Sequence, residues 1–208
     1  MDTETNSDTD TRFPDHGPVC RSVAGLLDGI DEKHLTAPTP CPDYTVRELL
    51  GHLVGLTLAF RDAGKKELGA TTDTAPTDSL PQLAEDWRTV LPAQLDGLAD
   101  AWRSPDAWQG FTRAGGVDLP GQVAGIIALN ELVVHGWDLA RSTGQEYDVD
   151  RASLEATLSF LEPAAASAEA GEAPEGLFGP PVAVPADAPL LDRVIGLSGR
   201  RPDWLPGR

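Results

Sequence analysis

Apolar residues recur at three- and four-residue intervals along most of the chain, which is the spacing of one face of an α-helix. Four long segments show this pattern: residues 18–34, 45–65, 81–102 and 120–142. A fifth segment, 150–162, is expected to end before Pro163, because the residue preceding a proline disfavours the helical conformation. A short helix is also expected over residues 189–198. The pattern therefore predicts a largely helical protein.

Two of these segments carry recognisable end signals. Thr45-Val-Arg-Glu48 is typical of a capping box, in which Thr45 accepts from the third backbone amide and Glu48 accepts from the amide of Thr45. Pro120 suits a first helical position, and Gly144 suits the left-handed residue that follows a helix. Local chemistry thus predicts where the second and fourth segments begin or end.

The connections contain residues that interrupt helices. Residues 36–43 include three prolines and are expected to form a loop, and residues 66–80 lack periodicity and are expected to be a surface loop. A short hairpin is expected around residues 114–116. Since strand signals are otherwise scarce, the predicted fold class is all-α: an up-and-down four-helix bundle with a short irregular C-terminal extension.

One domain is expected to cover residues 15–208. The chain of 208 residues is long enough for one full hydrophobic core. Residues 1–14 are acidic and polar, and we expect a disordered tail because they bury too little apolar surface to offset their ordering entropy. They also lack the basic and apolar regions of an export signal, so a cytoplasmic location is expected.

The overall charge excludes two classes of partner. The formal net charge is −17 and the pI is about 4.4, so nucleic-acid backbones and anionic membrane surfaces repel the chain. No run reaches the roughly 18 uninterrupted apolar residues that a membrane-spanning helix needs. Cys20 and Cys41 lie too far apart for a CxxC pair and are predicted to be reduced, buried thiols.

Three candidate metal ligands lie on predicted core faces. His52 lies on the apolar stripe of the second segment, between Leu49 and Leu56. Glu131 precedes His135 by four residues in the fourth segment, so both side chains project from one helical face. Two imidazoles and a carboxylate form a known ligand set for catalytic zinc, with a fourth position left for water or substrate. The same set binds iron(II) or nickel(II), so the ligands alone do not determine the metal.

An alternative interpretation needs no metal. A lone buried histidine is more often a hydrogen-bonded core residue than a ligand, and a Glu-x-x-x-His pair occurs by chance on many helices. Glu131, however, lies in the most apolar part of the chain, with no Lys or Arg between Arg113 and Arg141. Burying its charge is costly without a cation, so its pKa is expected to rise in the metal-free protein.

Three further polar residues have simpler interpretations. Asp138 lies one helical turn after His135 and is either a hydrogen-bond acceptor for that ring or a solvated carboxylate at the helix end. His16 and His34 lie near predicted helix ends in polar surroundings. Both are expected to be exposed surface histidines.

Two segments resemble a known family. Residues 39–55 (TPCPDYTVRELLGHLVG) and 131–141 (ELVVHGWDLAR) are similar to the mycothiol-dependent maleylpyruvate isomerase N-terminal family, within the DinB-like superfamily. Residues 176–187 and 192–200 resemble an actinobacterial subgroup that is often described only as metal-binding. The resemblance covers roughly residues 15–204.

The resemblance implies a DinB-like bundle in which His52, Glu131 and His135 hold a divalent metal, with mycothiol as a co-substrate in an actinobacterial host. Isomerases of this family carry an additional C-terminal domain, where this chain has a short tail. A thiol-dependent transfer other than the maleylpyruvate reaction is therefore favoured.

The predicted function is that of a metal-binding protein, most simply a zinc-dependent S-transferase or isomerase that uses mycothiol or another low-molecular-weight thiol. Its partners would be the thiol and a small electrophile, and no side chain is assigned as a nucleophile. The alternative is a non-catalytic metal-binding or sensing protein. The oligomeric state, including a homodimer, stays open.

Overall fold

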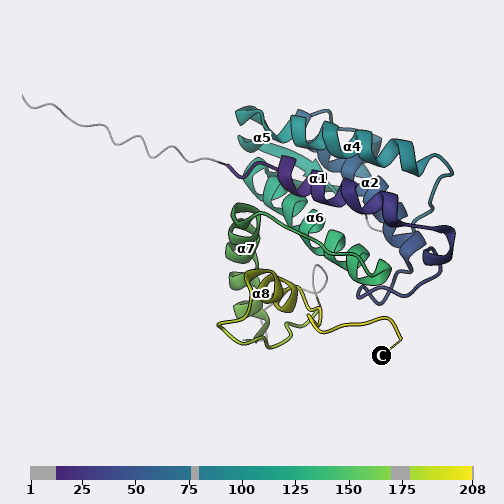
Figure 1. The fold of residues 1–208 in the computed structure, drawn as a ribbon. Coiled ribbons are helices and arrows are strands. Elements are labelled where there is room, and N and C mark those ends of the chain that lie inside the picture. Colours follow the sequence, from purple (N-terminus) through teal and green to yellow (C-terminus); the bar gives the residue numbers. More distant parts are fainter. Residues whose placement is uncertain (1–12, 76–79, 170–178, 208) are drawn as a thin grey trace, which may run out of the picture.

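Four helices form the bundle shown in Figure 1, in a computed structural model that describes residues 13–75, 80–169 and 179–207. They are α1 (Gly17–Leu26), α2 (Val46–Lys65), α4 (Trp87–Trp102) and α6 (Gly121–Thr143). Helix α2 packs against α4 and α6, and α1 packs against the same two helices. The predicted all-α four-helix bundle is confirmed.

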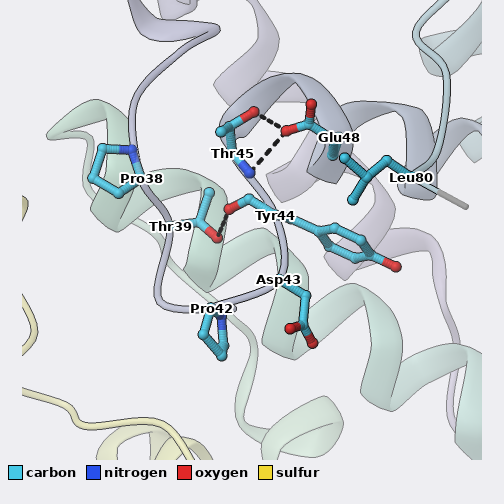
Figure 2. Close-up of a pocket in the computed structure, with 8 residues that line it drawn as sticks. All are labelled: Pro38, Thr39, Pro42, Asp43, Tyr44, Thr45, Glu48 and Leu80. Atoms are coloured by element: carbon cyan, nitrogen blue, oxygen red, sulfur yellow. Dashed lines mark hydrogen bonds between the residues drawn. The ribbon is translucent and has the colours of Figure 1, made fainter. Parts of the chain in front are cut away.

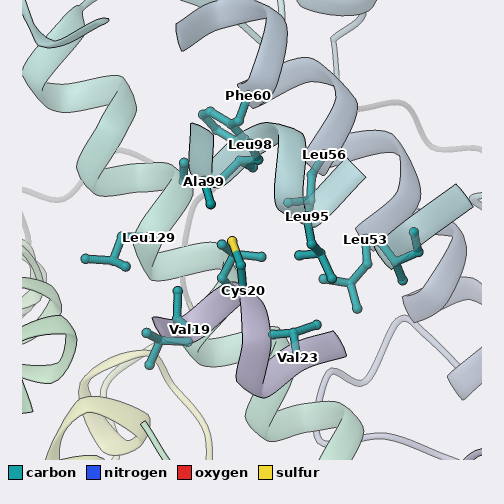
Figure 3. Close-up of a cluster of buried hydrophobic side chains, with 14 of the residues drawn as sticks. Val19, Cys20, Val23, Leu53, Leu56, Phe60, Leu95, Leu98, Ala99 and Leu129 are labelled. Carbon is teal, nitrogen blue, oxygen red and sulfur yellow. The ribbon is translucent and has the colours of Figure 1, made fainter. Parts of the chain in front are cut away.

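The core lies where the apolar stripes of all four helices meet (Figure 3). Helix α1 contributes Val19 and Cys20, α2 contributes Leu53, α4 contributes Leu95 and α6 contributes Leu129, and each of these side chains is buried. Burial raises the pKa of the Cys20 thiol to about 12, so this residue packs as a small hydrophobe, as predicted.

The first helix is shorter than predicted. Helix α1 ends at Leu26, and two 3₁₀ turns, Leu27–Gly29 and Glu32–His34, replace the remainder of the expected helix. The side-chain amide of Gln145 donates to the Leu26 carbonyl at 3.0 Å and occupies the space beside Gly29. A residue from a distant segment therefore satisfies the end of α1, which no local pattern indicates.

Two of the three predicted helix-end signals, the capping box at Thr45 and Gly144, are confirmed, and the predicted place of Pro120 is wrong by one position. The capping box at Thr45 is formed, with the Thr45 amide donating to Glu48 Oε2 at 2.9 Å. Helix α6 ends at Gly144, which has a left-handed φ of 70°. Pro120 precedes the helix as its N-cap instead of occupying its first turn.

The connections differ in detail from the prediction. The hairpin is present as β1 (Phe111–Ala114) and β2 (Val117–Pro120), with Ala114 opposite Val117. The expected loop over residues 66–80 contains the short helix α3 (Ala70–Asp73), and α5 (Pro105–Trp108) precedes the hairpin. Helix α4 begins at Trp87, six residues later than predicted, although Leu83 still packs against the core.

The C-terminal part packs beside the bundle (Figure 1). Helix α7 (Arg151–Glu169) contacts α6, and α8 (Leu190–Leu197), which was predicted, contacts α7. The expected stop before Pro163 is wrong, since α7 continues through it. Proline has no backbone N–H, so the carbonyl of Ser159, four residues earlier, loses its helical hydrogen bond. Pro163 and Ser159 are both exposed, so this carbonyl can bond to solvent instead.

Two expectations concern the chain's surroundings. Among the described residues, α6 alone is long and apolar enough to cross a membrane, but 78% of its most apolar window is buried inside the protein, as in a core helix. Of the predicted N-terminal tail, residues 1–12 lie outside the described residues. Phe13 is described, and its ring stacks on Trp108 with centroids 4.7 Å apart.

Candidate metal centre

His52, Glu131 and His135 come together where α2 packs against α6. The Nε2 atom of each histidine lies 3.3 Å from the same oxygen, Oε2 of Glu131. All three candidate ligand atoms lie within 4.8 Å of one another. The helices thus bring together the three residues that the sequence analysis selected, although they are up to 83 positions apart along the chain.

The donor set fits a divalent metal. Ligand atoms about 2.0–2.1 Å from a tetrahedral zinc ion lie roughly 3.3 Å apart, which matches both nitrogen-to-oxygen distances at Glu131. Across the part of the chain that the structure describes, no fourth His, Cys, Asp or Glu completes the group. The His52 and Glu131 side chains are 29% and 18% exposed, so solvent or a small ligand reaches this edge. An accessible three-ligand site is the arrangement of catalytic zinc centres.

The charges within the triad correct one expectation. Burial favours the neutral form of Glu131, but hydrogen bonds from His135 and His52 outweigh it and hold the Glu131 pKa below its ordinary value. For His135, burial lowers the pKa, but Asp138 and Glu131 outweigh it and raise the pKa to about 9. The expected rise of the Glu131 pKa in the metal-free protein is therefore wrong, because His135 on the same helix and His52 on α2 both form hydrogen bonds with its carboxylate.

Asp138 lies one turn after His135 on α6 and contacts the ring nitrogen that faces away from Glu131. It is fully buried, and its Oδ2 accepts a hydrogen bond from His135 Nδ1 at 2.9 Å, so the alternative of a solvated carboxylate is wrong. The same oxygen lies 3.2 Å from Nη2 of Arg200, in the segment after α8. Sequence reasoning assigned Arg200 no role, because it lies 62 positions beyond Asp138 and belongs to no helical pattern.

A pocket lies against the proline-rich loop and the start of α2 (Figure 2), and none of the three candidate ligands lines it. Tyr44 is one of its lining residues, and the Tyr44 ring lies 5.4 Å from the His52 ring. Glu48, one helical turn before His52, also lines it. Burial raises the pKa of the Tyr44 phenol, which stays protonated at neutral pH and can donate a hydrogen bond. The remaining lining residues are Pro38, Thr39, Pro42, Asp43, Thr45 and Leu80.

The other histidines lie outside this group. His16 was expected at the surface but is 1% exposed, with its ring 5.7 Å from that of Trp102 and 5.6 Å from that of Trp108. Burial lowers its pKa to about 4. His34 is half-buried, and its Nδ1 accepts from the Asp31 amide at 3.0 Å, so it caps a turn.

The remaining cysteine behaves as the sequence predicted. Cys41 lies in the proline-rich loop, is buried and forms no disulfide. Burial raises the pKa of its thiol, although the positive charge of Arg200 opposes the shift. Cys41 is therefore a protonated, packed thiol.

Comparison with known proteins identifies the family of the helical bundle. The model of the family described as "Mycothiol maleylpyruvate isomerase N-terminal domain" matches residues 16–140. The chain belongs to this family. The matched segment contains His52, Glu131, His135 and Asp138, and it ends before Arg200.

Individual proteins and solved structures are also similar to this chain. Uncharacterized proteins from two strains of Mycobacterium tuberculosis are 28% identical over 193 residues, which is 86% of this chain and 92% of theirs. The crystal structure of a mycothiol-dependent maleylpyruvate isomerase superposes with a TM-score of 0.57 at 18% identity, covering 90% of this chain and 89% of that one. A mutant of that enzyme gives a TM-score of 0.55.

The structural match establishes the DinB-like fold and corrects one premise. A large C-terminal domain without a counterpart in this chain would leave much of the isomerase unmatched, yet 89% of it is covered. The preference for a reaction other than that of maleylpyruvate therefore loses its structural basis.

Proposed function

We propose that this protein is a metal-dependent enzyme that activates mycothiol, or a similar low-molecular-weight thiol, for S-transfer to a small electrophile or for isomerisation. The observation that carries the proposal is the accessible triad of His52, Glu131 and His135 beside the pocket at Tyr44. Membership of a family described by mycothiol and maleylpyruvate isomerisation supports the choice of thiol. Zinc is the first candidate metal, with nickel and iron as alternatives, and the expected location is the cytoplasm, where thiols stay reduced.

In this proposal the three ligands would bind the metal, and the residues around Tyr44 would bind the substrate. His52, Glu131 and His135 would hold the divalent ion, which would favour the thiolate form of a thiol bound beside it. The exposed edge at His52 gives the released proton a path to solvent. The protonated Tyr44 phenol, close to His52, would be the hydrogen-bond donor that this side of the site offers to a ligand.

A thiolate formed in this way would be able to undergo two reactions, S-transfer and isomerisation. In S-transfer, a sulfur–carbon bond forms at the electrophilic carbon while the leaving group departs with its electron pair. In isomerisation, the thiolate adds to a carbon–carbon double bond conjugated to a carbonyl, and the π electron pair moves to the carbonyl oxygen. After rotation about the new single bond, the sulfur–carbon bond breaks, the double bond re-forms and the thiolate is recovered.

The rival function is a metal-binding protein without catalysis, in which the ion serves stability or sensing. A closed site with four protein ligands would favour it. The three-donor group with an exposed edge favours the enzyme instead.

Metal content and thiol consumption test the proposal together. The purified protein is expected to contain about one divalent metal per chain by elemental analysis. The triple variant His52→Ala, Glu131→Ala, His135→Ala should lose the metal, whereas His34→Ala, which removes a histidine outside the triad, should keep it. In the presence of mycothiol, the wild type should consume the thiol with a panel of alkyl halides and epoxides, or convert cis-unsaturated keto acids to their trans isomers without consuming it, and the triple variant should do neither.

The possible failures separate the alternatives. Full metal occupancy in the triple variant would place the metal elsewhere. A metal-loaded wild type that neither consumes thiol with any electrophile nor isomerises any keto acid of the panel would favour the non-catalytic rival.

A further inference from the structure

The segment that follows α8 returns to the candidate metal centre through one half-buried arginine, Arg200. The Arg200 side chain is 12% exposed, although it comes from near the C-terminus (Figure 1). Its Nη1 donates to the Ser198 carbonyl at 2.9 Å, and its Nη2 donates to Asp138 Oδ2 at 3.2 Å. The guanidinium is therefore held between its own segment and α6.

When a neutral His135 binds a metal, Arg200 is the cation that remains in contact with Asp138. Its side chain is 0% exposed, and within the described residues its second oxygen, Oδ1, has no hydrogen-bond partner. Its Oδ2 accepts from His135 Nδ1 and from Arg200 Nη2. A buried carboxylate left without a cation is strongly unfavourable, so removal of Arg200 would force Asp138 to move or to seek another partner.

The position of Asp138 determines which nitrogen of a neutral His135 ring carries the proton. A carboxylate accepts hydrogen bonds, so the proton of a neutral His135 ring lies on Nδ1. The lone pair is then on Nε2, the atom that lies 3.3 Å from Glu131 Oε2 and faces the candidate metal position. A hydrogen-bond partner behind a ligating histidine fixes both its tautomer and its orientation.

From this chain of contacts we propose that Arg200 is a positioning residue of the metal centre: it holds the Asp138 carboxylate, which in turn orients His135 for metal binding. The inference rests on the proposed metal site. It assigns to the C-terminal segment a part in metal affinity that no residue of the matched domain supplies.

The structure offers a matched control. Arg141 also ties the C-terminal segment to α6, since its Nη2 and Nε donate to the Trp204 carbonyl at 2.6 and 3.2 Å. No contact joins Arg141 to Asp138 among the hydrogen bonds and ion pairs of the described residues. Replacing Arg141 thus loosens the same segment without touching the carboxylate behind His135.

The test measures zinc affinity by competition with a chromophoric chelator, in full-length wild type, Arg200→Met, Arg200→Lys, Asp138→Asn and Arg141→Met. Loss of an outer hydrogen-bond partner typically weakens metal binding about 10–100-fold, and we expect this for Arg200→Met. Arg200→Lys should recover part of the loss, and Arg141→Met should remain within about twofold of wild type. Combining Arg200→Met with Asp138→Asn should add little to either change, because both act on one hydrogen bond.

A spectroscopic readout separates positioning from general stability. In the zinc-loaded wild type the Nδ1 proton of His135 should exchange slowly with solvent in proton NMR, and in Arg200→Met it should exchange faster while far-UV circular dichroism is unchanged. If Arg200→Met does not fold, Arg200→Lys and Asp138→Asn provide the same comparison. Wild-type affinity in Arg200→Met, or an equal loss in Arg141→Met, overturns the inference while leaving the metal site intact. A wild type that binds no metal overturns both proposals.

Discussion

The buried imidazole of His16 predicts a specific loss of stability in acid. Its Nε2 lies 2.9 Å from the Gly125 carbonyl, to which a neutral ring can donate, and burial lowers its pKa from 6.5 to about 4. The folded state therefore binds a proton less readily than the unfolded state. The free energy of unfolding is unaffected by His16 above pH 6.5 and falls as the pH decreases toward 4.

The magnitude follows from the difference in pKa. A shift of one unit corresponds to about 1.36 kcal/mol, so lowering the pKa from 6.5 to about 4 corresponds to a maximal loss of about 3 kcal/mol. At pH 5 the unfolded state is almost fully protonated at this residue while the folded state is not. The loss between pH 7.5 and pH 5 should then be about 2 kcal/mol.

The perturbation that isolates this effect is His16→Gln, which keeps a donor for the Gly125 carbonyl but does not titrate. Urea unfolding of wild type and variant at pH 7.5 and pH 5 gives two differences, and the wild-type difference should exceed that of the variant by about 2 kcal/mol. Phe13→Leu is the matched control, because Phe13 stacks on Trp108 in the same aromatic cluster without titrating. It should lower stability by a similar amount at both pH values.

The reasoning is refuted if wild type and His16→Gln lose the same stability between the two pH values. That result would show that the protonated ring finds a partner in the folded state. A pH-dependent effect of Phe13→Leu would instead show that the whole cluster rearranges in acid.

Two further predictions concern α6. In the metal-free protein, Glu131→Gln should lower the free energy of unfolding by about 1.5–3 kcal/mol at pH 6, where the bond from His135 is charge-assisted. The raised pKa of His135 stabilises the fold fully below pH 6.5, and this stabilisation is lost as the pH rises through about 9, so the difference in stability between wild type and Glu131→Gln should be smaller at pH 9. Urea unfolding at both pH values measures this difference. Equal stability of the two proteins at pH 6 would mean that the hydrogen-bonded histidine does not stabilise the Glu131 carboxylate. Gly136→Ala should destabilise by about 1–3 kcal/mol, since a Cβ there would lie 2.2 Å from the Tyr147 hydroxyl. Gly55→Ala on α2 meets open space and should stabilise by up to about 1 kcal/mol, and thermal unfolding that ranks the two glycine variants the other way would contradict the packing argument.

Local chemistry in the sequence determined the elements that place the metal candidates. The capping box at Thr45 sets the start of α2, and therefore the face on which His52 lies. The four-residue spacing of Glu131 and His135 puts them on one face of α6. These features depend on residues within about one helical turn, so they can be read without knowing the rest of the fold.

Tertiary packing alone decided the environment of each polar group. Glu131 gains a second partner, His52, across the helix interface, Asp138 gains Arg200 from the C-terminal segment, and His16 is enclosed by tryptophans of distant segments. The same holds for the end of α1, where Gln145 accounts for a boundary that periodicity placed too late. Hydrophobic periodicity shows which face of a helix is buried, but the charge state and partner of a buried polar group depend on which distant segment packs against it, and that is a property of the whole chain.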